Sequence, residues 1–215
     1  LVVIPARYNS TRLPGKLLIK LNNKAVLQHV WEKCVNAVGH GNVLVAAGDK
    51  KIHNFCLKSK IKSILISKKC LTGTDRVFEV SRKIKKKFYI NVQGDEIFLN
   101  PKTILKVIHF SKKFPNHIIN CMANIKSSHD YKNASVPKVV INNNNELLYM
   151  SRAPIPGSKK MNFYKAYRQV CVYSFTKNFL STFAILLVKY IYKFICIWRK
   201  FNDKSSNYWN GTVWS

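Results

Sequence analysis

The chain has 215 residues, and its 37 Lys and Arg against 9 Asp and Glu give a formal net charge of +28. This length suits one α/β domain, or one domain with a smaller lobe. The charge admits a nucleic-acid-binding protein, but the basic residues lack the interleaved aromatic residues of a single-strand binder.

Mutational bias is the alternative explanation of this charge. Runs such as "KKK" at 85–87 and "NNNN" at 142–145 are typical of A+T-rich coding DNA. With either origin, the charge attracts anionic substrates. The six cysteines form no C-x-x-C pair and have no His at ligand spacing, so buried reduced thiols are favoured over disulfides or a zinc site. No secretory leader opens the printed sequence, and the expected compartment is the cytoplasm.

Apolar strands and amphipathic helices alternate over the first two-thirds of the chain. Short apolar runs predict strands, and apolar residues at helical spacing predict helices. In chain order these elements are strands at 1–6, 43–48, 63–67, 88–96 (ending in a polar tip) and 118–125, with intervening helices at 25–38, 50–58, 74–84 and 101–114. The alternation predicts a mostly parallel sheet flanked by helices, whose ligands bind beyond the carboxyl ends of the strands.

The pattern changes after about residue 127. The segments "VPKVVIN", "ELLYMSR" and "VCVYSF" predict antiparallel strands, the first two joined across the Asn run. We therefore expect an α/β core at 1–126, a smaller antiparallel lobe at 127–178 and an aberrant apolar and basic tail at 179–215.

The segment "ARYNSTRLPGK" follows the first strand and carries Arg7, Arg12 and Lys16 around a Pro-Gly turn. Gly15 gives backbone freedom, and the N–H groups of such a loop can surround phosphates. The three cations can oppose a triphosphate. The Walker pattern is absent. A solvated basic loop is the alternative, and the position after a buried strand argues against it.

Asp95 lies in "NVQGDE", just past a mostly apolar strand. A carboxylate at a strand end near a phosphate loop suits a Mg²⁺ that bridges phosphate oxygens. An Asp after Gly is also a common turn residue, and its pairing with the opening loop favours the metal.

Two further segments leave two readings open. In "TGTDR", Thr74 is expected to cap the following helix and Asp75 to favour its first turn. The segment is then either a helix cap only, or a helix cap in which Arg76 also binds substrate. In "SRAPIPG", Arg152 could bind a carboxylate through its two-pronged guanidinium, or the segment is a surface turn.

In order, "IPARYNSTRLPGK", "TGTDR", "NVQGDE", "SRAPIP" and "YRQVCVYSF" resemble the 3-deoxy-manno-octulosonate cytidylyltransferase family over roughly residues 1–180. The resemblance implies a nucleotide-binding α/β core of the nucleotide-diphospho-sugar transferase type, with a small lobe that forms a homodimer. It implies synthesis of CMP-Kdo and pyrophosphate from CTP and 3-deoxy-D-manno-octulosonate (Kdo), with Mg²⁺, for lipopolysaccharide biosynthesis. Neither a nucleic-acid partner nor a membrane span is expected.

The same resemblance assigns the site residues. The catalytic residues are Arg12, Lys16 and Asp95, and Asp95 is also the metal ligand. The nucleotide-binding residues are Ala6, Arg7, Arg12, Lys16 and Arg76. The sugar-binding residues are Gln93, Arg152, Gln169 and Tyr173.

The chain departs from the family at several places. Gln169 stands for a histidine, Cys171 for a glycine and Ile97 for a proline. The later S-P-L-E and G-V-D-T-P-E-D-L segments, the second of which completes the metal site, are not found. Instead, residues 179–215 are mostly apolar and basic, which indicates a frameshift or a decayed gene.

The apolar stretch 179–198 has the length of a membrane span, but it contains Lys189 and Lys193, which are costly inside a bilayer. An amphipathic or poorly folded segment is therefore favoured. These departures predict slow turnover or none. A CTP-binding remnant without activity and a basic nucleic-acid-binding protein are the alternatives.

Overall fold

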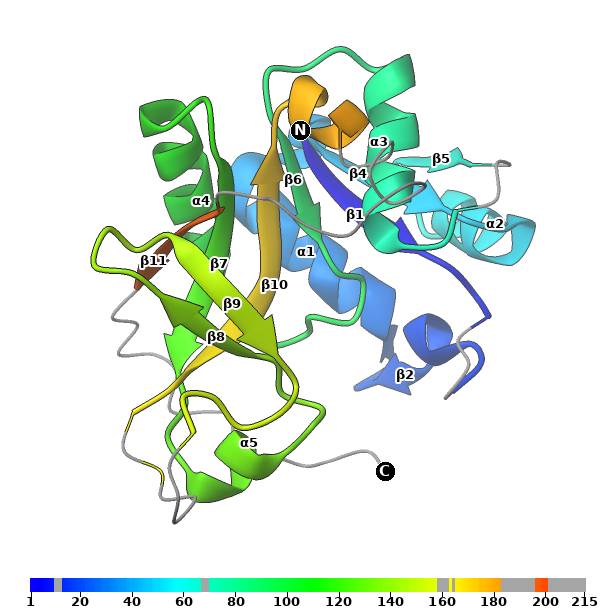
Figure 1. Cartoon of the computed structure of the whole chain (residues 1–215). Coiled ribbons are helices and arrows are strands. Elements are labelled where there is room, and N and C mark those ends of the chain that lie inside the picture. The colour runs from blue at the N-terminus through cyan, green and yellow to red at the C-terminus, as the bar shows by residue number, and fades with distance from the viewer. Residues whose placement is uncertain (10–12, 67–69, 158–162, 164, 183–195, 201–215) are drawn as a thin grey trace. The chain divides into compact units, whose positions relative to one another are not determined.

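The computed structural model describes residues 1–9, 13–66, 70–157, 163, 165–182 and 196–200 (Figure 1). These residues form two compact units. The first combines Leu1–Ile119 with the chain from Cys171, and the second combines Asn120–Val170 with the chain from Phe194. The three stretches expected from the sequence, 1–126, 127–178 and 179–215, stay a prediction.

A parallel sheet forms the core of the first unit. Its strand order is β6 (Tyr89–Val92), β1 (Val2–Ala6), β4 (Val43–Ala47) and β5 (Ser63–Leu65). Val3 lies opposite Leu44 on one side and Asn91 on the other. All residues of β1 and β4 are buried, as expected of strands covered on both faces. The end of β10 (Tyr167–Phe175) pairs antiparallel with β6.

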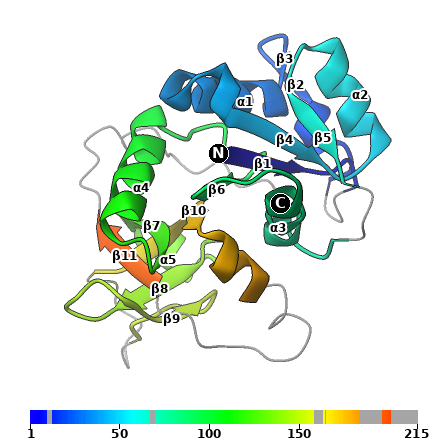
Figure 2. The same ribbon diagram turned by 90° about the horizontal axis from the view of Figure 1, so that it is seen from above.

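Helices cover both faces of this sheet. Figure 2 shows α1 (Val26–Val38) and α2 (Lys50–Lys58) on one side of β1, β4 and β5, and α3 (Gly73–Lys83) on the other. The chain builds outward from β1 to β4 and β5 and then returns to place β6 on the opposite side of β1. Such a reversal opens a crevice at the carboxyl ends of the two strands, where ligands of these folds bind.

Local signals explain where the helices begin. Helix α4 (Pro101–Lys113) has proline in its first turn, as predicted, because that position needs no N–H donor. The predicted cap of α3 was wrong by two residues. Thr72, not Thr74, is the N-cap, and its Oγ1 accepts from the Asp75 N–H at 3.2 Å while the Asp75 carboxylate accepts from the Thr72 N–H at 2.8 Å. This reciprocal pair is the capping box.

A short hairpin after the opening loop was not predicted. Strands β2 (Lys20–Leu21) and β3 (Lys24–Ala25) pair antiparallel across Asn22 and Asn23. Both asparagines have positive φ, 48° and 65°, which is the backbone that a type I′ hairpin turn requires. The sequence carried this signal, but two-residue strands are too short for an apolar pattern.

The second unit is mainly antiparallel. Strands β8 (Lys138–Ile141) and β9 (Leu147–Ser151) form a hairpin across the Asn run, and the start of β10 pairs with β8. The unit also contains most of β7 (Ile118–Asn124), helix α5 (Ser128–Lys132) and β11 (Cys196–Lys200). A small cluster of Ile125, Tyr131 and Ala166 is buried there. The predicted fold class, a mostly parallel sheet flanked by helices with a smaller antiparallel part, is confirmed.

No helix in the described part of the chain has the length and apolar character needed to cross a membrane. The apolar stretch discussed above falls largely at 183–195, outside the described residues.

Candidate active site at the carboxyl edge of the sheet

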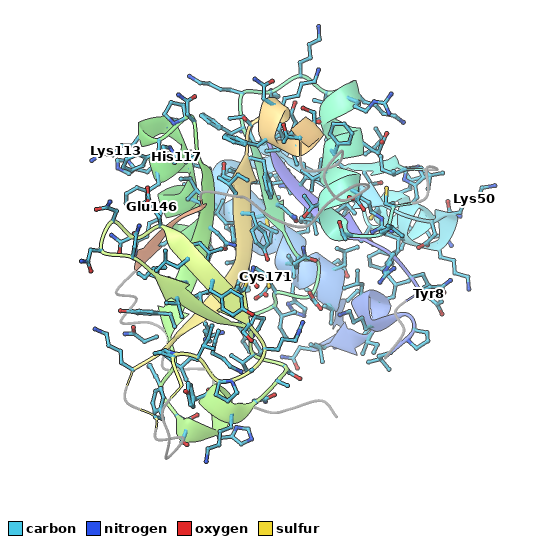
Figure 3. The ribbon with its side chains drawn as sticks, viewed as in Figure 1. Tyr8, Lys50, Lys113, His117, Glu146 and Cys171 are labelled. Atoms are coloured by element: carbon cyan, nitrogen blue, oxygen red, sulfur yellow. The ribbon has the colours of Figure 1, made fainter. Side chains whose placement is uncertain are left out.

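The opening loop leaves β1 at its carboxyl end, where Ala6 O accepts the Gly48 N–H at 2.7 Å. Tyr8 lies just beyond that end (Figure 3). The loop closes on itself, because the Gly15 N–H donates to Tyr8 O at 2.8 Å. Gly15 has φ of 72°, a left-handed conformation that residues with a Cβ adopt only with strain. Arg7 is exposed, and Arg12 lies outside the described residues.

The loops after β1 and β6 meet through an ion pair. Lys16, in the first turn after the opening loop, bonds the carboxylate of Asp95, which follows β6. Their side chains are 37% and 44% exposed. Exposed pairs of this kind add little net stability, so either partner can exchange the other for a ligand at low cost. The structure thus brings the predicted phosphate cation and the predicted metal ligand together.

Arg76 is the most buried cation of this edge, with 8% of its surface exposed. Its two terminal nitrogens donate to Thr72 O and Cys70 O over 3.4 and 3.5 Å, which are long hydrogen bonds. The buried Nε has no partner. Because the Nε is enclosed, the terminal nitrogens, which make only these long bonds, are the donors of Arg76 that can turn to an anion.

Burial lowers the pKa of Arg76, and the neighbouring charge of Arg7 acts in the same direction. The carboxylates of Asp75 and Asp49 partly oppose this. The guanidinium lies across residue 48: a Cβ built on Gly48 would come within 2.7 Å of the Arg76 Nε. Glycine is therefore the residue that lets the Arg76 side chain occupy this place.

Gln93, Cys171 and Tyr173 lie near Asp95 in the first unit. The half-buried Gln93 side chain borders Gly73, since a Cβ there would lie 3.2 Å from its Nε2. Burial raises the pKa of the Cys171 thiol to about 12, and the charges of Glu96 and Asp95 add to this, while a hydrogen bond with Tyr173 opposes it. The thiol therefore stays protonated at neutral pH and is a weak nucleophile and ligand there.

Arg152 and Gln169 belong to the second unit. The exposed Arg152 side chain donates from Nη1 to Ala134 O at 2.9 Å. Its own carbonyl accepts from the ammonium of Lys138 at 2.7 Å, and that ammonium also donates to Asn133 O at 2.8 Å. The Gln169 N–H donates to Pro137 O at 3.0 Å.

Lys138 is fully buried, and burial lowers its pKa, as does the charge of Arg152. The predicted sugar residues are thus divided between the units, with Gln93 and Tyr173 in the first and Arg152 and Gln169 in the second.

The Mg²⁺ predicted from the sequence can be compared with the donor groups that the structure describes. No group of three or more His, Cys, Asp or Glu side chains suited to a metal occurs among the described residues. Asp95 offers an exposed carboxylate at a strand end, which is the oxygen chemistry that Mg²⁺ prefers. This ion is often held by one or two carboxylates plus substrate phosphates. Asp95 therefore fits as one protein ligand of a site that the substrate phosphates would complete.

A cleft of about 290 Å³ lies at the amino edge of the same sheet, lined by Leu1, Phe88, Ile108 and other residues. The two lysines in its lining, Lys86 and Lys87, face no acidic residue there. The cleft is therefore separate from the candidate site.

Sequence reasoning missed Asp49, which follows β4 and bonds both the opening loop and α2. A carboxylate directly after the second strand, at the start of a helix, was the available signal.

A family model described as cytidylyltransferase matches residues 1–200, beyond residue 180, where the motif resemblance ends. A 3-deoxy-manno-octulosonate cytidylyltransferase of Elusimicrobium minutum is 37% identical over 162 residues, which cover 75% of this chain and 66% of that protein. One from Escherichia coli is 31% identical and covers 86% of this chain and 75% of its own length. An 8-amino-3,8-dideoxy-manno-octulosonate cytidylyltransferase of Shewanella baltica is 33% identical with similar coverage, 86% and 78%.

The chain thus spans about two thirds to three quarters of these relatives. A solved CMP:2-keto-3-deoxy-manno-octonic acid synthetase in complex with CTP superposes with a TM-score of 0.79 at 32% identity, covering 86% of this chain and 77% of that one. A cytidylyltransferase structure from Leptospira borgpetersenii, at 13% identity and a TM-score of 0.56, shares the fold alone. These matches confirm the resemblance seen in the motifs, and the chain belongs to the cytidylyltransferase family.

Proposed function

We propose that this chain transfers CMP from CTP to the anomeric hydroxyl of Kdo and releases pyrophosphate. One observation carries the proposal: Lys16 and Asp95 meet where the chain reverses between β1 and β6, the place at which such sheets bind nucleotides. The likeness to a synthetase in complex with CTP, at 32% identity, supports cytidine as the base.

The nucleotide side is built from cations of the first unit. Arg7 and Lys16 flank the opening loop, and Arg76 contributes a guanidinium whose terminal nitrogens make only long hydrogen bonds. Together with Arg12 they would neutralise the triphosphate and hold the α-phosphorus for in-line attack. In phosphoryl and nucleotidyl transfer such positioning and charge neutralisation supply most of the catalysis.

Mg²⁺ is proposed as the cofactor, with Asp95 as its protein ligand. The ion supplies charge neutralisation at phosphate oxygens. Lys16 would then pair with a phosphate instead of with Asp95. In the described structure, the ion pair of Lys16 with Asp95 balances the charges of both side chains until a nucleotide binds.

Kdo is the proposed acceptor, and Arg152 is the proposed partner of its carboxylate. The guanidinium fork matches a carboxylate bidentately. The loop that carries Arg152 is tied down by the buried Lys138 ammonium, so its backbone position is set before any sugar binds. The assignments of Gln93, Gln169 and Tyr173 to the sugar remain predictions.

A homodimer is proposed through the second unit. The middle of β9 exposes three large apolar side chains, Leu148, Tyr149 and Met150, at 63%, 62% and 43%, and since successive side chains of a strand point to opposite faces, they do not all share one face. Apolar groups grouped in this way mark association surfaces more often than single exposed ones do. A second copy is the occupant that the family resemblance implies.

The cytoplasm is the proposed compartment. Three cysteines described by the structure, Cys34, Cys56 and Cys171, are free thiols. Unpaired thiols are typical of reducing compartments.

A coupled pyrophosphate assay tests the activity. We expect release with CTP, Kdo and Mg²⁺ together that is slower than release by an intact relative, because of the departures from the family, and loss of this release in Asp95→Asn, which removes the charge that faces Lys16. The intact E. coli relative is the positive control, and 8-amino-3,8-dideoxy-manno-octulosonate is offered as an alternative acceptor. Equal release with ATP would contradict cytidine recognition. A CTP-dependent rise in melting temperature without pyrophosphate would instead identify a binding remnant.

Arg152→Lys separates sugar binding from nucleotide binding. The lysine keeps the charge but lacks the planar fork, so we expect the Kd for Kdo to rise about tenfold, which corresponds to about 1.4 kcal/mol. The Kd for CTP should stay the same. Calorimetry measures both, and equal weakening of the two ligands would show that the residue acts on folding.

Gly48→Ala tests whether the position of Arg76 matters for the nucleotide. The added methyl group would displace a guanidinium that lies 2.7 Å from it, so CTP should raise the melting temperature of this variant much less than that of the unaltered chain. Gly41→Ala is the matched control, because nothing lies within 4 Å of a Cβ at that position. A full CTP shift in Gly48→Ala would remove Arg76 from the nucleotide site.

Tyr149→Lys tests the dimer by light scattering. A charge in an apolar contact is strongly unfavourable when buried, so the variant should be monomeric where the unaltered chain is dimeric. Leu57→Lys is the control, since Leu57 is exposed to a similar degree, 59%, on α2. Dimers of equal strength in both variants would exclude β9 from the interface.

A further inference from the structure

A carboxylate outside the opening loop, that of Asp49, holds the start of the loop. The N–H of Tyr8 donates to Asp49 Oδ2 at 2.6 Å, across 41 positions of the sequence. The other oxygen, Oδ1, accepts the Ile52 N–H at 3.0 Å and caps α2. One side chain therefore joins the start of the loop to the start of a helix.

Tyr8 is the residue through which this hold reaches the rest of the loop. Its carbonyl accepts the Gly15 N–H at 2.8 Å, which closes the loop at its base. Its ring packs against Gly15, where a Cβ would come within 3.1 Å of Cε2, and the Lys51 ammonium lies 4.2 Å from the ring centroid. With the N–H, the carbonyl and the ring all engaged, a shift of Tyr8 would move both ends of the loop.

Asp49 also supplies negative charge where cations gather. Its carboxylate supports the charged form of Arg76, against burial and the repulsion of Arg7. Both oxygens of Asp49 are already occupied by backbone N–H groups. The carboxylate is thus fixed in place and compensates the cations without being a ligand.

We infer that Asp49 is a positioning residue of the nucleotide site, which holds the base of the opening loop, at Tyr8 and Gly15, in the place from which the adjoining Lys16 meets the triphosphate. This inference rests on the proposed function, because it assigns a purpose to the loop that binds CTP. It goes beyond that function in naming a residue that touches neither substrate nor metal.

Asp49→Ser separates the two hydrogen bonds. Serine is a good N-cap, so it can still accept from Ile52, but its side chain is too short to reach Tyr8 as well. In the full chain, we expect amide exchange measured by NMR to accelerate about tenfold at Tyr8, and to remain unchanged at Ile52. The KM for CTP should also rise about tenfold, because the loss of one hydrogen bond to a charged group changes an affinity by about this factor. The KM for Kdo should stay constant.

Asn42→Ala is the matched control. Asn42 lies at the other end of β4 and donates to Val38 O at 2.9 Å, so this variant also loses one polar contact of the first unit. Its melting temperature should fall as far as that of Asp49→Ser, with no change at Tyr8 or in the KM for CTP.

The outcomes distinguish the inference from the proposed function. Unchanged Tyr8 exchange in Asp49→Ser overturns the inference, and so does faster exchange with an unchanged KM for CTP. If the unaltered chain neither binds nor turns over CTP, the proposed function has failed instead. In that case the Tyr8 exchange rate alone decides whether Asp49 holds the loop.

Discussion

The pairing of β1 with a parallel neighbour on each side is the constraint on which the rest of the first unit depends. Every residue of β1 is buried, so its backbone groups must find partners within the sheet. Parallel pairing sends the following loops to one edge, and the reversal of the chain places β6 directly beside β1. The contact of Lys16 with Asp95, 79 positions apart, is a consequence of that strand order.

The division of labour between the units follows from the same architecture. Residues expected to handle the nucleotide are all in the first unit, where the buried sheet fixes the loop ends. Residues expected to handle the sugar are divided, and β10 carries Gln169 in the second unit and Tyr173 in the first.

Much of the fold of the first unit could be predicted from sequence because its signals are local. Apolar runs located β1 and β4, and Pro101 located the start of α4. The cap of α3 was missed although T-x-x-D begins at Thr72, because the second threonine of the segment was preferred. Two-residue strands such as β2 and the five-residue α5 carry too few residues for a periodic signal.

The site could be predicted only in part. Single motifs made Lys16, Asp95 and Arg76 candidates, and they stay predictions. Their contacts depend on strand order, which no local pattern contains. Asp49 was missed because its partner is the backbone N–H of Tyr8. Almost every residue carries such a group, so the sequence does not show which one a carboxylate will bind. Arg12 falls outside the described residues and stays a prediction.

Lys138 shows what a count of charges conceals. Most lysines of this chain are consistent with a drift of codons toward A and T, and a drifting position tolerates replacement. Lys138 has no exposed surface, and its ammonium is the donor for two backbone carbonyls. An apolar substitute would remove this donor from both carbonyls. Asn133 O would keep the Val136 N–H at 3.1 Å, whereas the Arg152 carbonyl would lose its bond to the ammonium, at a cost of about 1–3 kcal/mol. Lys138 therefore has a structural role that its residue type does not reveal, and its burial distinguishes it from the exposed lysines of the chain.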